Sequence, residues 1–184
     1  DILIRGKKKS QYSFVNNLLK TIKETGVNSN YPLNLLKAFK QDVEKKRYKD
    51  WQDLIDYCNK SASPVGRFVI DLHYLSNNNY DKNIESVYCG SDSLCNSLQI
   101  LNHIQDCKKD FIDLNRVYIP EIYFSDFNFS TDQILKQEYR KNLLQAIKKC
   151  LQQVENMLDK SKENIMLINN NKRLKMETYV IFNI

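Results

Sequence analysis

The chain has 184 residues, a length that fits one domain. Its four glycines and three prolines are too few for the many turns of an all-β sandwich or barrel. The 28 lysines and arginines exceed the 22 aspartates and glutamates, which suits an anionic ligand or an anionic membrane surface. Because this surplus is spread along the chain, it lacks the dense basic patch of a nucleic-acid-binding protein, and we expect no nucleic-acid partner.

The first half of the chain is expected to form three helices. Apolar residues at helical spacing predict a helix over 12–26 that ends at a glycine, and a second helix over 32–48. A third helix begins after Asp50, a suitable N-cap, and Pro64 should kink or interrupt it before it continues to Tyr74. The apolar residues that mark the second helix are Leu33, Leu36, Phe39 and Val43, and those expected on one side of the third are Trp51, Leu54, Ile55 and Cys58.

Capping residues mark the two longest helices expected in the second half. Ser91 is expected to cap a helix over 92–113, and Ser130 and Gln133 fit the capping box of an amphipathic helix over 131–160. Without an internal repeat or a long linker, the pattern predicts one all-α domain over 1–184. The other expected features are a loop of Asn77, Asn78, Asn79 and Asp81, core-facing Leu94, Leu98 and Leu101, an irregular segment over 114–129 and a last helix over 162–184.

The cysteines indicate a reducing compartment. They are odd in number and form no C-x-x-C pair, so we expect reduced thiols in a cytoplasmic protein, with contact at the inner face of the membrane left open. No run approaches the ~18 apolar residues of a membrane span, and no signal peptide opens the chain. Because the chain starts without methionine and stops inside an apolar run, we expect a fragment cut at both ends.

The helix expected over 92–113 carries a polar stripe. Asn102, Asp106 and Asp110 recur every four residues, so they lie on one side of the helix over about 12 Å. Proteins hold Mg²⁺ with one or two carboxylates together with substrate phosphates, so two aspartates one turn apart are suitable ligands. A solvated helix face is the alternative interpretation of the same pattern.

The residues around the stripe match a longer pattern, LQ-x-x-N-x-x-x-D-x-x-x-D followed by R-x-Y-x-P. This segment resembles the second aspartate-rich motif of the squalene/phytoene synthase family, although Asn115 stands where many members have glycine. The resemblance implies an all-α, isoprenoid synthase-type helical bundle around a central cavity. The matching residues are Leu98, Gln99, Asn102, Asp106, Asp110, Arg116, Tyr118 and Pro120.

A second match lies upstream, over 57–66. It resembles the family's Y-C-x-x-V-A-G-x-V-G, a kinked helix whose small residues let the substrate approach, and Ser61, Ser63 and Pro64 depart from the common form. These departures are similar to the bacterial hydroxysqualene synthase branch. Further residues that carry this likeness are Phe39, Gln41, Asp42, Arg47, Tyr48, Asp50, Trp51, Arg67, Asp71, His73, His103, Arg173, Met176 and Glu177.

The resemblance implies a role for each matching residue. In the hydroxysqualene branch, presqualene diphosphate would lose diphosphate with the help of Mg²⁺, and capture of water would give hydroxysqualene, a precursor of hopanoids. The implied Mg²⁺ ligands are Asp106 and Asp110, the implied catalytic residues are Asn102 and Tyr57, with Tyr57 beside the carbocation, and the implied substrate contacts are Gly66, Gln105, Arg116 and Tyr118.

Two other functions stay open at this point. Sister members of the family join two prenyl diphosphates, such as farnesyl diphosphate, head to head, and the same motifs serve that reaction. Mitochondrial assembly factors for respiratory complex I resemble the family without its chemistry, but their aspartate motifs are degraded, whereas Asp106 and Asp110 are both present. The family's first aspartate-rich motif would lie upstream of Asp1, so residues 1–184 alone are expected to be inactive. The oligomeric state is not predicted.

Overall fold

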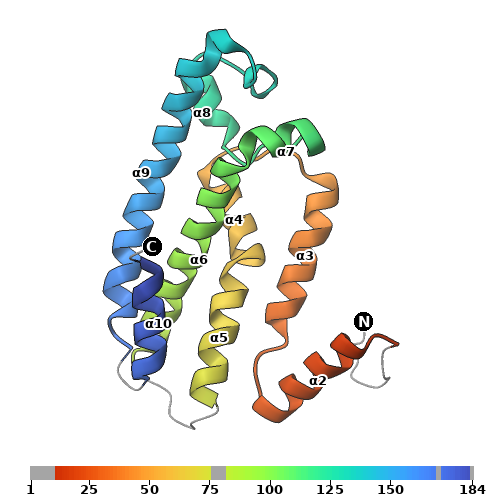
Figure 1. The fold of residues 1–184 in the computed structure, drawn as a ribbon, viewed down its shortest axis with the longest axis vertical. Helices are drawn as coiled ribbons and strands as arrows, with labels where there is room; N and C mark the ends of the chain where they lie inside the picture. The colour runs from red at the N-terminus through yellow and green to blue at the C-terminus, as the bar shows by residue number, and fades with distance from the viewer. Residues whose placement is uncertain (1–10, 76–81, 169–170, 183–184) are drawn as a thin grey trace.

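The computed structural model describes residues 11–75, 82–168 and 171–182 (Figure 1). These residues contain no β-strand, so the all-α prediction is confirmed. The expected loop of Asn77, Asn78, Asn79 and Asp81 lies outside the described residues. The elements are α2 (Ser13–Thr25), α3 (Asn30–Glu44), α4 (Trp51–Ser61), α5 (Ser63–Leu75), α6 (Ile84–Gln105), α7 (Cys107–Leu114), α8 (Glu121–Asp126), the 3₁₀ turns η1 (Thr131–Gln133) and η2 (Gln137–Tyr139), α9 (Arg140–Ile165) and α10 (Lys172–Phe182).

Helix α6 is at the centre of the bundle. It packs against α9 on one side and against α5 on the other, and α3 packs against both α4 and α5. Figure 1 shows α9, α6 and α3 running along the long axis of the molecule, with α7 turning away from the upper end of α6. Within the described ranges, no helix is long and apolar enough to cross a bilayer.

Three of the helix boundaries expected in the first half, at Gly26, at Asp50 and near Pro64, are confirmed. Gly26 has a φ of 75°, the left-handed conformation that glycine adopts without strain, and it ends α2. The Asp50 carboxylate accepts a hydrogen bond from the Asp53 N–H at 2.9 Å and so caps α4. The helix is interrupted at Ala62, two residues before Pro64, because proline has no N–H to bond the carbonyl four residues earlier and is tolerated in the first turn of the helix that follows.

The helix predicted over 32–48 is shorter than expected, and part of its apolar side is exposed to solvent. Helix α3 ends at Glu44, and the chain then becomes extended, so Tyr48 is a fully buried residue outside the helix. The reason is a backbone pairing with a distant segment: the Val117 N–H donates to the Lys46 carbonyl at 3.0 Å. The apolar side of α3 is partly exposed, since its exposed side chains include Leu36, Phe39 and Val43.

The start of α6 differs from the expectation for a different reason. The helix begins well before the expected cap, and Ser91 is a buried residue inside it. This first part packs closely on α9, where the Ser161 hydroxyl donates to the Gly90 carbonyl. A side-chain carbon at Gly90 would lie 2.8 Å from the Asn164 Cβ, so glycine is needed for this approach. Tertiary packing therefore outweighs the capping signal.

The helix predicted over 92–113 is in fact two helices. Helix α6 ends at Gln105, and α7 begins at Cys107 after a change of direction at Asp106 (Figure 1). Leu94 is buried as expected. Leu98 is 44% exposed, so its assignment to the core is wrong, because it lines an open groove between α6, α9 and α10.

The segment predicted to be irregular over 114–129 contains the short helix α8. After it, the Ser130 N–H donates to the Gln133 Oε1 at 2.8 Å, as a capping box requires, but the helix that follows is only the 3₁₀ turn η1. The buried side chains of Thr131 and Ile134 explain this shortness, because packing against the core beneath α8 holds the segment out of a continuous helix.

The two C-terminal helices therefore have other bounds than predicted. The long amphipathic helix is α9, over 140–165 rather than 131–160. The last described helix is α10, over 172–182; it begins at 172 rather than 162, and the predicted end at 184 lies outside the described residues. Ala146, Cys150 and Val154 line the buried side of α9. Helical spacing thus identified the existence of both helices but not their first residues.

Candidate functional site

The predicted polar stripe crosses the junction between α6 and α7. Asn102 lies in α6, Asp106 is the residue at the change of direction, and Asp110 lies in the first turn of α7. Helical hydrogen bonds continue through the junction: the Asp106 N–H donates to the Asn102 carbonyl at 2.9 Å, and the Asp110 N–H donates to the Asp106 carbonyl at 2.8 Å. The two carboxylates therefore stay one turn apart although the helix axis changes direction.

The carboxylates of Asp106 and Asp110 have no hydrogen-bond or ion-pair partner among the described residues. Burial, and then the charge of Asp106, raise the pKa of Asp110, while the nearby Arg116 lowers it. Two like charges one turn apart favour a bound cation. No group of three or more histidine, cysteine or acidic side chains gathers within the described chain, so a metal here would need oxygen ligands from substrate or water. Mg²⁺ accepts that ligand set, and the residues present fit it.

Asn115 explains how Arg116 reaches this junction. Asn115 adopts the left-handed conformation, with a φ of 49°, and ends α7. This is the position where the family pattern commonly has glycine, the residue that enters this region at least cost. The Arg47 guanidinium fixes the turn by donating to the Asn115 backbone carbonyl and, at 2.7 Å, to its side-chain oxygen. The turn directs the next residue, Arg116, back toward α3.

A hydrogen-bond network joins Arg116 to two tyrosines through Asp42, at the C-terminal end of α3. The Asp42 carboxylate accepts from the Tyr57 hydroxyl at 3.1 Å and from the Tyr118 hydroxyl at 3.5 Å. The Arg116 guanidinium donates to the Asp42 backbone carbonyl and, at 3.3 Å, to the Tyr118 hydroxyl. The structure thus brings together three predicted site residues, Tyr57, Arg116 and Tyr118, around Asp42.

The tyrosines belong to a buried aromatic group that is uncharged at neutral pH. The rings of Tyr118 and His103 stack with centroids 3.4 Å apart, and the Tyr57 ring lies 5.6 Å from Tyr118 and 5.3 Å from Tyr48. Burial raises the pKa of Tyr57 and of Tyr118. Burial, and then the charge of Arg116, lower the pKa of His103 to about 3. We call Tyr48, Tyr57, His103 and Tyr118 the aromatic wall.

Asp42, Tyr48 and His103 are the residues that sequence reasoning missed as site residues. All three lie in segments that carry the family likeness, but no short motif assigns any of them a role. Their place depends on how α3, α4 and α6 pack together. A signal was present for His103: it stands between Asn102 and Asp106, on a helix whose neighbouring positions were already assigned to the site.

Comparison with known proteins identifies the family. A model of the family described as squalene/phytoene synthase matches residues 5–180. The chain belongs to this family. It is 40% identical over 134 residues to a hydroxysqualene synthase of Sinorhizobium fredii, covering 73% of this chain and 43% of that protein. It is 39% identical over 149 residues to a hydroxysqualene synthase of Zymomonas mobilis, covering 81% of this chain and 47% of that protein. The chain spans about half the length of these relatives.

The fold is also that of a solved member. The crystal structure of squalene synthase HpnC from Alicyclobacillus acidocaldarius superposes with a TM-score of 0.77 at 24% identity. The superposition covers 99% of this chain and 67% of the HpnC chain. This likeness supports the isoprenoid synthase-type helical fold expected from the motifs.

The other predicted family residues lie apart from the aromatic wall. Gly66 faces α6, where a side-chain carbon would lie 2.3 Å from the Ser91 hydroxyl, so glycine is needed for this helix contact. Gly66 also lines an apolar cavity of about 160 Å³ between α5, α6, α9 and α10. Asn102 and Gln105 are exposed, and Gln105 lines a different pocket, with Lys108 and Arg140 at its edge. No contact joins these three predicted residues to Tyr57 within the described chain.

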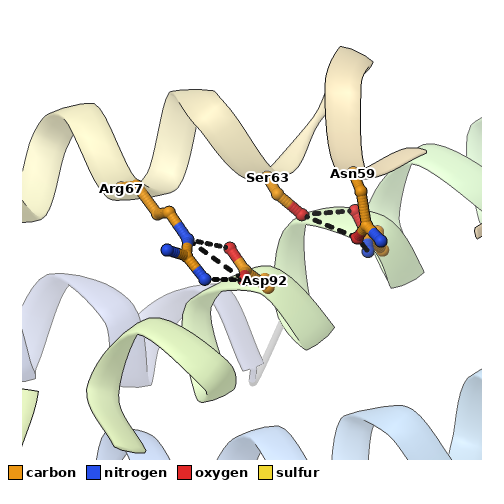
Figure 2. Close-up of polar contacts among 5 residues, drawn as sticks. Asn59, Ser63, Arg67 and Asp92 are labelled. Carbon is orange, nitrogen blue, oxygen red and sulfur yellow. Dashed lines mark hydrogen bonds and ion pairs between the residues drawn. The ribbon is translucent and has the colours of Figure 1, made fainter. Parts of the chain in front are cut away.

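The family's kinked-helix motif leads to a second group of polar residues, shown in Figure 2. The Ser63 hydroxyl donates to the Asn96 Oδ1 at 2.8 Å, and the Asn96 amide donates to the Asn59 Oδ1 at 2.8 Å. The Arg67 guanidinium makes a two-pronged pair with Asp92, at 2.9 and 2.6 Å. We call these five residues the interhelical cluster, because they join α4 and α5 to α6.

Proposed function

We propose that the full natural chain that contains these residues converts presqualene diphosphate to hydroxysqualene, with release of diphosphate and with Mg²⁺ as cofactor. The observation that carries the proposal is the pair of unpartnered carboxylates, Asp106 and Asp110, beside Arg116 and close to an uncharged aromatic wall. Family membership supports prenyl diphosphate chemistry in general. The names of the two relatives near 40% identity favour the hydroxysqualene branch.

The diphosphate would be held at the α6–α7 junction. Asp106 and Asp110 would bind Mg²⁺, which when bound neutralises the charge of the leaving diphosphate. Arg116 lies close to this pair of carboxylates, and its Nε has no hydrogen-bond partner among the described residues. A guanidinium is well suited to this task, since it donates two parallel hydrogen bonds to phosphate oxygens.

The aromatic wall would stabilise the carbocation that remains. The faces of tyrosine rings attract positive charge, and this attraction is strongest where water is excluded. Because burial keeps Tyr57 and Tyr118 protonated, neither wall hydroxyl is a phenolate that would trap the cation as an ether, and the neutral His103 adds no positive charge that would repel it. Asp42 would hold the two tyrosine hydroxyls at fixed positions.

The test is to incubate the full natural chain with presqualene diphosphate and Mg²⁺ and to extract the lipids for mass spectrometry. Hydroxysqualene as the product, lost on addition of a chelator, is the expected result. A coupled product from farnesyl diphosphate alone would move the chain to the head-to-head prenyltransferases. No consumption of either diphosphate would contradict the enzyme proposal and favour a non-catalytic member of the family.

A further inference from the structure

Ser61, the last residue of α4, has a buried hydroxyl without a partner. Its Oγ is shielded from solvent and makes no hydrogen bond to any described residue. A serine inside a helix usually bonds a backbone carbonyl one turn earlier, and a buried hydroxyl without a partner is unfavourable. The unpaired Ser61 hydroxyl is therefore suited to hydrogen-bond to a small polar molecule.

The neighbouring serine provides a direct contrast. Ser61 and Ser63 stand on either side of the helix break at Ala62, where the family pattern Y-C-x-x-V-A-G-x-V-G has valine and glycine. The Ser63 hydroxyl is used within the protein, since it contacts Asn59, as Figure 2 shows, and also Asn96. Of the two hydroxyls that this chain adds to the motif, one is satisfied by the protein and the other is not.

Ser61 lies on the same face of α4 as Tyr57, a residue of the aromatic wall. Ser61 follows Tyr57 by four residues, so the two side chains lie on the same face of α4, about 6 Å apart along its axis. Tyr57 on that face contacts Tyr118 and His103. Ser61 is therefore one helical turn beyond Tyr57, the residue whose ring the proposed function places beside the carbocation.

We propose that Ser61 holds the water molecule that the carbocation captures, and that this hydroxyl determines an alcohol product rather than a hydrocarbon. This inference rests on the proposed function. After the bond between carbon and diphosphate oxygen breaks, with both electrons leaving on oxygen, a lone pair of the water forms the new C–O bond. One O–H bond of that water then breaks, and its proton passes to the released diphosphate. No oxidant or reductant is consumed. Valine at this position would leave proton loss to diphosphate, which gives a hydrocarbon, as the main outcome.

The test compares Ser61→Val with Ser61→Thr in the full natural chain. The two replacements have almost the same shape, and only threonine keeps the hydroxyl. With presqualene diphosphate and Mg²⁺, the ratio of alcohol to hydrocarbon is expected to fall at least tenfold in Ser61→Val and to stay within about threefold of wild type in Ser61→Thr. Ser61→Ala, the mildest change for a helix, is expected to lower the ratio as well.

Ser97→Val is the matched control, because Ser97 also has a buried hydroxyl without a partner but lies in α6, outside the kinked motif. Its product ratio is expected to equal that of wild type. Equal ratios in Ser61→Val and Ser61→Thr, or an equal fall in Ser97→Val, would overturn the role of Ser61. If the wild-type chain consumes no presqualene diphosphate, the proposed function itself fails, and the two failures are thus distinguishable.

Discussion

The junction cluster (Asp106, Asp110 and Arg116) and the interhelical cluster use the same residue types in opposite ways. In the interhelical cluster, the guanidinium of Arg67 and the carboxylate of Asp92 satisfy each other. In the junction cluster, the two carboxylates and the Arg116 Nε find no partner in the described chain. Polar groups that are paired with one another hold helices together, whereas unpaired ones suit a ligand. Pairing, rather than residue type, separates the two clusters.

The largest effect is expected from the junction carboxylates. Asp106→Asn or Asp110→Asn in the full natural chain should lower turnover more than about 100-fold, because the charge that would hold Mg²⁺ is lost. The melting temperature should change little, since neither carboxylate has a protein partner. The matched control is Asp113→Asn, an exposed residue of the same helix, which should keep wild-type turnover. A large fall in melting temperature in the two junction variants would instead indicate a structural role.

The aromatic wall should make folding stability depend on pH. Burial holds the pKa of His103 at about 3, below its value in an unfolded chain, so between about pH 6.5 and pH 3 only the unfolded chain binds the proton. This histidine should therefore remove about 2 kcal/mol of stability when the pH falls from 8 to 5. Denaturant unfolding of wild type and His103→Phe at both pH values measures the difference. The same pH dependence in both proteins would contradict the burial of a neutral imidazole.

A smaller effect is expected at Arg116. Arg116→Ala should raise the inhibition constant of inorganic diphosphate about tenfold. Arg116→Lys should recover only part of the lost affinity, because an ammonium cannot make the two-pronged contact. Unfolding curves recorded beside these measurements separate ligand binding from the contact of Arg116 with the Asp42 carbonyl. Unchanged inhibition in Arg116→Ala would exclude a diphosphate contact.

The local motifs predicted the parts of the site that lie close together in sequence. Asp106 and Asp110 share one turn, and Arg116 and Tyr118 follow directly after it, so spacing alone placed them together. Asp42 could not be found in this way, because its contact with Tyr118 depends on the packing of α3 against residues far along the chain. Only the fold brings the end of α3 to the turn after α7.

The predicted bounds of some helices were wrong for a related reason. Local signals predicted a start at Ser91, but the close approach of α9 at Gly90 extends α6 toward its N-terminus. The burial of Ile134 similarly keeps the chain after Ser130 from forming a long helix. Capping residues and apolar spacing act within a few residues, whereas these contacts join segments distant in sequence.

The smallest effect is expected at the interhelical cluster. Arg67→Met should lower the free energy of unfolding by about 1 kcal/mol, because the pair with Asp92 is only half-buried and is screened by solvent. Turnover per folded molecule should stay at the wild-type value. Asp126→Asn breaks the more exposed pair with Lys149 and serves as the control, with a smaller loss. Loss of turnover in Arg67→Met without loss of stability would remove the distinction between the two clusters.

The most direct test of the central claim is a calorimetric titration of Mg²⁺ into the full natural chain with inorganic diphosphate present. Wild type is compared with Asp110→Asn, which removes an unpaired carboxylate, and with Asp92→Asn, which removes a paired one. We expect binding in wild type and in Asp92→Asn, and a loss of at least tenfold in affinity in Asp110→Asn. Equal affinity in all three proteins, or a loss confined to Asp92→Asn, would contradict the assignment of the junction cluster as the metal and diphosphate site.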